Sequence, residues 1–133
     1  DKAWKDVNGF DDFLFIDGVD FDFSRRITEA KYRILECSNV ILTHEIGTTI
    51  DVGLGKHHFP SIYAHNRIRK YYQERNYPYI DNKFGEYSYL KELSRFVKHC
   101  FFVIFFEKTK SQKLKAMVKG RRDALKLIQQ TNK

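Results

Sequence analysis

The sequence NGFDDFLFIDGVDFDFSRR, residues 8–26, decides the fold prediction. Gly18 marks a sharp turn in it, and an apolar side chain recurs every four residues after that turn, at Val19, Phe23 and Ile27. This spacing predicts a helix from about residue 20 to residue 31. Further on, 32–36 and 40–44 read as two short strands, and the glycine-containing stretch 46–58 reads as a loop.

Three helices are predicted in the second half of the chain. The first opens at Pro60-Ser61 and is kinked or ended near Pro78. The second runs from about 89 to 107, with Ser88 as its cap, and the third from about 111 to 129. The apolar stripe of the third helix is Leu114, Met117, Val118, Leu125 and Ile128. The fold class predicted from these elements is α+β, predominantly helical with a few short strands.

Composition limits the classes of function. The chain has 133 residues, of which 42% are hydrophobic and 16% aromatic, which fits one folded domain rather than a disordered chain. Its net charge of +7 favours anionic partners. The longest nearly apolar run, 100–106, is far shorter than the ~20 residues that span a bilayer. Cys37 and Cys100 form neither a metal-binding spacing nor a disulfide framework, so we expect a cytoplasmic location.

The carboxylates of the 8–26 stretch are its chemistry-bearing groups. Asp20 lies near the N-terminus of the predicted helix, where the helix dipole favours the ionised form that a general base needs. Asp22 and Arg26 are four residues apart and can pair along one helix face. Capping of the helix by Asp20 and Asp22, without any catalysis, is the alternative.

Four motifs in order resemble family 2 glycosyltransferases of the GT-A fold, and especially their rhamnosyltransferase branch. The family has Gly-Gly-Phe-Asp-Glu followed by Phe-Ile-Asp-x-Val-Asp-x-Glu-Trp-x-x-Arg, then His-x-x-Gly, Arg-x-Tyr-Tyr-x-x-Arg-Asn and Lys-Gly-x-x-Asp-Gly-Leu. The corresponding segments here are 8–26, 44–47, 69–76 and 119–125. Asn8, Asp22, Phe23 and Ala124 depart from the family pattern.

The resemblance implies a role for each matching residue. Asp20 would be the base that deprotonates the acceptor hydroxyl in an inverting transfer, and Asp17 and Asp22 would bind the acceptor. His44 would be a ligand of a divalent metal, Mg²⁺ or Mn²⁺. Four residues would bind the donor diphosphate: Arg69, Tyr72, Arg75 and Asn76. For each of them a structural role, as a turn, core or surface residue, is the alternative.

The resemblance also implies a longer enzyme. Nothing here matches the family's nucleotide-binding half, so we expect a C-terminal part of a GT-A glycosyltransferase that lacks that half. Residues 1–58 would be the acceptor-side catalytic segment and 59–133 a C-terminal helical region. The parent would transfer a sugar, with rhamnose as the example, from a nucleotide-sugar donor to a cell-surface polysaccharide or a lipid-linked acceptor.

Two further partners follow from charge and aromatic content. The apolar stretch 101–106 and the lysines after it could rest on an anionic membrane at the inner face of the cell, or pack against the nucleotide-binding half. The lysines concerned are Lys108, Lys110, Lys113, Lys115 and Lys119. A basic nucleic-acid-binding or partner-binding helical module is the alternative function, although the acidic N-terminal segment would repel phosphates.

Overall fold

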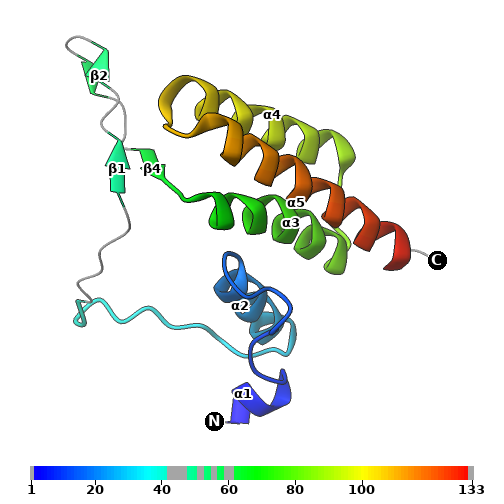
Figure 1. The fold of residues 1–133 in the computed structure, drawn as a ribbon. Helices are drawn as coiled ribbons and strands as arrows, with labels where there is room; N and C mark the ends of the chain where they lie inside the picture. Colours follow the sequence, from blue (N-terminus) through cyan, green and yellow to red (C-terminus); the bar gives the residue numbers. More distant parts are fainter. Residues whose placement is uncertain (1, 42–47, 51–52, 55–56, 59–61, 132–133) are drawn as a thin grey trace. The chain divides into compact units, whose positions relative to one another are not determined.

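A computed structural model describes residues 2–41, 48–50, 53–54, 57–58 and 62–131. These residues form five helices and two minimal strand pairs (Figure 1). The chain divides into two compact units, residues 1–43 and 44–133. The predicted functional division at residue 58 is a different one and stays a prediction.

The predicted fold class is wrong, because the described chain is built from helices. Residues 32–37 form no strand, and Ile34 and Leu35 are exposed; 42–44, the end of the second predicted strand, lie outside the described residues. A strand needs a partner edge for its backbone groups, and residues 32–36 pair with no strand in the part of the chain described here.

Strand pairing occurs instead within and beside the stretch predicted as a loop. β1 (Thr48–Ile50) pairs antiparallel with β4 (Ile62–Ala64), and β2 (Gly53–Leu54) pairs antiparallel with β3 (His57–His58). With two or three residues per strand, these pairs form no layer on which helices could pack.

The first unit contains α1 (Lys2–Asp6) and α2 (Val19–Glu29), so the helix predicted after Gly18 is present. Gly18 precedes α2 in the left-handed conformation, with φ of 85°, which a residue with a Cβ rarely adopts. Leu14 and Ile27 are its buried apolar side chains, together with Val7 at the edge of burial. Because this apolar core is small, hydrogen bonds and ion pairs such as those of Arg26 contribute to the position of α2 within the unit.

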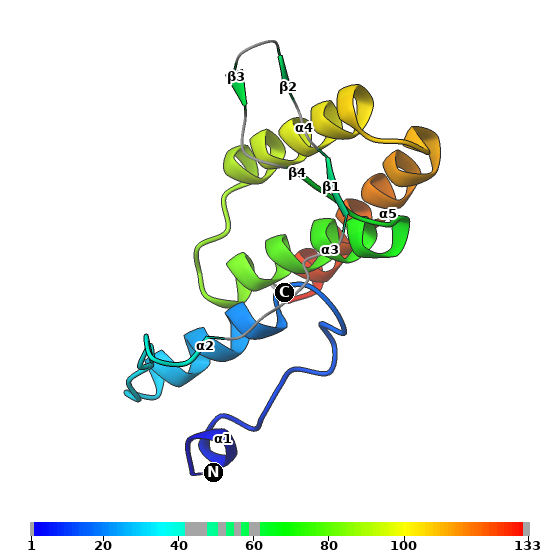
Figure 2. The same ribbon diagram turned by 90° about the vertical axis from the view of Figure 1, so that its left-hand side faces the viewer.

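The second unit is a group of three helices, α3 (Arg67–Lys83), α4 (Tyr89–Phe106) and α5 (Lys110–Thr131). Both ribbon views show α3, α4 and α5 close together (Figures 1 and 2). Their buried apolar side chains are Ile80, Val103, Met117, Ala124 and Ile128. Of the predicted stripe on α5, Met117 and Ile128 are buried, whereas Val118 is 48% exposed.

The boundaries of α3 differ from the prediction. The helix begins after Asn66, whose side-chain oxygen accepts a hydrogen bond from the backbone N–H of Arg69 at 2.9 Å. Pro78 does not end the helix, which continues to Lys83. Pro78 is fully buried, so packing of its ring offsets the backbone hydrogen bond that a proline cannot donate. Ser88 precedes α4 as predicted but makes no side-chain capping bond.

The closest approach in the second unit is between α3 and α5. A Cβ added at Gly120 of α5 would lie 2.2 Å from the carbonyl oxygen of Tyr71 on α3. The Tyr71 hydroxyl donates a hydrogen bond to Asp123 Oδ2 at 2.9 Å, one turn further along α5. Burial, followed by the bond to Asp123, raises the pKa of Tyr71 above its usual value. The 119–125 motif thus packs directly against the 69–76 motif.

Candidate active site

The two acidic residues at the start of α2 lie in opposite environments. Asp22 is fully buried, and its Oδ2 accepts a hydrogen bond from Arg26 Nε at 2.8 Å. Asp20, two residues earlier, is exposed. Residues two apart on a helix do not share a face, which explains the difference. The predicted pair between Asp22 and Arg26 is confirmed.

Arg26 joins α2 to the segment before it. Its guanidinium also donates to the backbone carbonyls of Val7 and Gly9, the latter at 2.8 Å. These bonds satisfy carbonyl groups that a turn would otherwise leave unpaired. Because one guanidinium holds both the buried carboxylate of Asp22 and two turn carbonyls, the turn before α2 is fixed relative to the helix.

An aromatic cluster covers the same junction. The rings of Trp4, Phe10 and Phe23 lie with centroids 4.8 to 5.3 Å apart. Gly9 has a φ of 63°, and a Cβ there would lie 2.7 Å from Trp4, so this position requires glycine. Sequence reasoning missed Trp4. The chain has a single tryptophan, and its place just before the aromatic-rich 8–26 stretch could have indicated that it packs there.

The backbone just before α2 is held in uncommon conformations. Phe15 and Asp17 have positive φ values of 59° and 63°, and Gly18 follows at 85°. A left-handed conformation costs a non-glycine residue about 1–2 kcal/mol, less for Asp than for a bulky side chain such as Phe. Such residues cluster at functional sites, where the surrounding structure holds them.

Asp20 is the exposed carboxylate in the first turn of α2. It makes no hydrogen bond or ion pair within the part of the chain that the structure describes. It lies in the first turn of α2, where the unpaired backbone N–H groups favour negative charge. An ionised, exposed carboxylate on a fixed backbone can accept a proton from a hydroxyl group. Asp17 is half-buried and already engaged in a polar or electrostatic contact.

Comparison with known proteins identifies no family for this chain. No family model, curated protein or solved structure matches this chain.

The residues predicted to bind a donor diphosphate all lie on α3, in the second unit. Arg75 donates from Nε to Asn76 Oδ1 at 2.8 Å, and its guanidinium lies 4.6 Å from the centre of the Tyr72 ring. Asn76 is fully buried, while Arg69, Tyr72 and Arg75 keep partial exposure. Asn76 is therefore a core residue. Arg69, Tyr72 and Arg75 are partly exposed and could contact a ligand.

The predicted metal ligand, His44, lies outside the described residues. Within the described ranges 2–41 and 62–131 no group of three His, Cys, Asp or Glu side chains could hold a metal ion.

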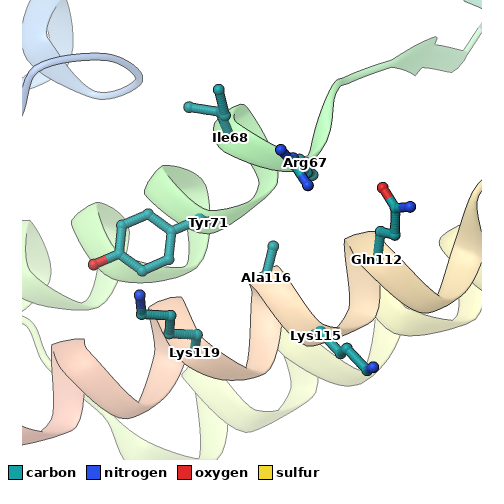
Figure 3. A pocket seen from close by; sticks show the side chains of 7 residues that line it. All are labelled: Arg67, Ile68, Tyr71, Gln112, Lys115, Ala116 and Lys119. Carbon is teal, nitrogen blue, oxygen red and sulfur yellow. The ribbon is translucent and has the colours of Figure 1, made fainter.

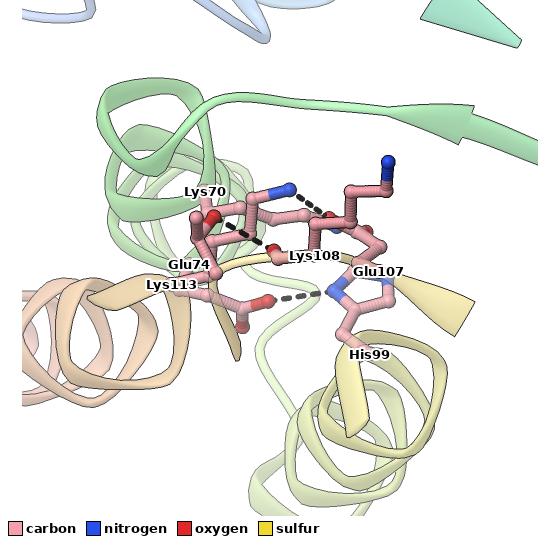
Figure 4. Close-up of polar contacts among 7 residues, drawn as sticks. Lys70, Glu74, His99, Glu107, Lys108 and Lys113 are labelled. Carbon is pink, nitrogen blue, oxygen red and sulfur yellow. Dashed lines mark hydrogen bonds and ion pairs between the residues drawn. The ribbon is translucent and has the colours of Figure 1, made fainter. Parts of the chain in front are cut away.

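The second unit also buries charges that sequence reasoning missed. Glu107 lies 2.8 Å from Lys70 Nζ and 2.5 Å from Lys113 Nζ, and all three side chains are nearly buried (Figure 4). Burial alone would raise the pKa of Glu107, but the bonds from Lys113 and Lys70 outweigh it and hold the pKa below the usual value of a glutamate. Near this cluster, Glu74 Oε1 lies 2.6 Å from His99 Nδ1 (Figure 4).

An open groove lies between α3 and α5 (Figure 3). Its volume is about 450 Å³, and its lining combines three cationic side chains with apolar and aromatic surface. The lining residues are Arg67, Ile68, Tyr71, Gln112, Lys115, Ala116 and Lys119. Lys119 lies 5.7 Å from the centre of the Tyr71 ring. These lysines are therefore directed to the α3–α5 side of the unit.

Proposed function

We propose that this chain carries the acceptor-side catalytic carboxylate of an inverting glycosyltransferase, with Asp20 as general base. The observation that carries the proposal is the contrast within α2: Asp22 is buried in an ion pair with Arg26, and Asp20 is exposed. The order of the four motifs that resemble family 2 glycosyltransferases supports the same activity.

In the proposed mechanism Asp20 accepts the proton of the acceptor hydroxyl as that oxygen attacks the anomeric carbon of the donor sugar. Asp17, on the strained turn, would bind the acceptor beside it. Asp22 would act as a positioning residue, because it is fully buried and holds Arg26 in place. A divalent metal, Mg²⁺ or Mn²⁺, would neutralise the leaving diphosphate, with His44 among its ligands.

The donor side of the proposal involves α3. Arg69, Tyr72 and Arg75 would contact diphosphate oxygens through charge-assisted hydrogen bonds, with Asn76 fixing Arg75. The nucleotide pocket would come from the nucleotide-binding half that the resemblance assigns to such enzymes. A cytoplasmic site of action fits the two cysteines, which are both free thiols.

The test is sugar-nucleotide turnover by this chain joined to that nucleotide-binding half, with Asp20→Asn compared with wild type across several donors and acceptors. Removal of a general base should lower the turnover number by ~10²-fold or more. Glu29→Gln is the matched control, because it neutralises an exposed carboxylate at the other end of the same helix.

Two outcomes would contradict the proposal. Equal turnover by Asp20→Asn and wild type, with both folded, would exclude Asp20 as the base. Absence of transfer with every donor would favour the alternative of a binding module, for which a salt-dependent shift of an oligonucleotide would be the positive sign.

A further inference from the structure

Helix α4 exposes an apolar face. Val97, Phe101 and Phe105 are 57%, 51% and 62% exposed, and they follow one another at intervals of four residues, so they lie on one side of the helix. Leu90 and Ile104 extend the same face, and Phe102 borders it. We call these six residues the α4 apolar face. A contiguous exposed patch of this kind marks an interaction site.

The acidic residues of this region point away from that face. Glu92 is buried and bound by Arg121, whose Nη2 lies 2.8 Å from its Oε2. Glu107, just after α4, is buried between Lys70 and Lys113. Both carboxylates are therefore paired with cationic side chains inside the three-helix group.

The charges left at the border of the α4 apolar face are all positive. Lys91 and Lys98 are exposed on one flank of α4, Lys108 is exposed in the turn that follows it, and Lys110 is exposed at the start of α5. Among the described residues from 89 to 110, every exposed charged side chain is a lysine. The surface is thus apolar in the middle and cationic at its edge.

We propose that α4 lies flat on an anionic lipid bilayer, with the α4 apolar face among the acyl chains and the four lysines among the headgroups. In-plane helices that bind membranes combine an aromatic apolar face with basic residues beside it. No described helix is both long and apolar enough to cross a bilayer. A protein partner would have to bury four lysines as well as the phenyl rings.

The apolar stretch 101–106 of the predicted membrane surface lies in α4, and the structure changes which lysines accompany it. Lys113, one of the lysines that the sequence pointed to, is buried in the pair with Glu107. Lys115 and Lys119 line the groove between α3 and α5. The inference does not depend on the activity of Asp20, although a membrane surface would suit an enzyme with a lipid-linked acceptor.

The test is flotation of the full chain with vesicles of phosphatidylcholine alone and of equal parts phosphatidylcholine and phosphatidylglycerol. Wild type should float with the anionic vesicles at low salt and lose binding as salt screens the lysines. Lys91→Gln, Lys98→Gln and Lys108→Gln should each lower the partition coefficient about fivefold. The double variant Phe101→Ser, Phe105→Ser should lower it at least tenfold.

Matched controls come from the α3–α5 groove. Ile68→Ser removes an apolar side chain that is 53% exposed, and Lys115→Gln removes an exposed lysine. Both should bind vesicles as wild type does. Equal losses for Lys115→Gln and Lys98→Gln would overturn the proposal, because they would show attraction by net charge without a defined face.

Self-association is the competing explanation for the apolar face. Sedimentation velocity without vesicles separates the two. Dimers that dissociate in the Phe101→Ser, Phe105→Ser variant, with no flotation of wild type, would overturn the lipid assignment in favour of a second copy of the chain. A monomer that floats only with anionic vesicles is the result expected.

Discussion

Gly120→Ala is the substitution whose effect the structure fixes most directly. In an exposed helix interior, replacement of glycine by alanine stabilises by about 1 kcal/mol. At Gly120 the new methyl would lie 2.2 Å from the carbonyl oxygen of Tyr71 and 3.3 Å from the backbone nitrogen of Arg75. Both neighbours are backbone atoms of α3, so no side chain can rotate away.

The size of the effect follows from that distance. Ordinary carbon–oxygen contact begins near 3.4 Å, so α3 and α5 would have to separate by roughly 1 Å. Overpacking of this kind costs about 3 kcal/mol at the upper end of the usual range. After subtraction of the helix-propensity gain, we expect a net loss of about 2 kcal/mol. For a unit of this size that loss lowers the melting temperature by roughly 10 °C.

The assay is urea and thermal unfolding followed by far-UV circular dichroism, which reports the long helices of the second unit. Fluorescence of Trp4, the single tryptophan, reports the first unit separately and should not change. Gln112→Ala, at an exposed position of α5, is the control for helix propensity. An unchanged or raised midpoint for Gly120→Ala would refute the close approach of α3 and α5.

Two other predictions concern buried charge. Arg26→Met should unfold the first unit and shift Trp4 emission to longer wavelength, because breaking a buried pair costs about 3–5 kcal/mol; Arg33→Met, at an exposed position, should leave the emission unchanged. The stability that Glu107 contributes should be lost as pH falls through its pKa in the folded chain, since that pKa lies below the one it has in the unfolded chain. In urea titrations across pH the gap between wild type and Glu107→Gln should therefore close on acidification, and a constant gap would contradict the assignment.

Much of the helical structure could be predicted from the sequence. The four-residue recurrence after Gly18 and the apolar stripe of α5 located these two helices to within about two residues, because periodicity is a local signal. The strands at 32–36 and 40–44 are predictions from local sequence. Strand formation depends on a partner edge, which local sequence does not show.

The arrangement of charge could not be predicted in the same way. Lysine and glutamate are rarely buried, and only the fold brings Lys70, Lys113 and Glu107 together. Gly120 belongs to the 119–125 motif that resembles glycosyltransferases. Its position against Tyr71 shows that this motif packs α5 against α3. The pair of Asp22 and Arg26 could be predicted from the sequence, since its spacing of four is a local feature.

The Asp-x-Asp spacing of Asp20 and Asp22 shows how secondary structure decides chemistry. In an extended segment, residues two apart lie on the same side, and two such carboxylates can share a metal ion or a sugar. In α2 the same spacing turns them to different sides, one into the unit against Arg26 and one to solvent. The pair therefore cannot act as a joint ligand here. Neutralising Asp22 should act on folding and on the position of Asp20, whereas neutralising Asp20, the proposed base, should act on proton transfer alone.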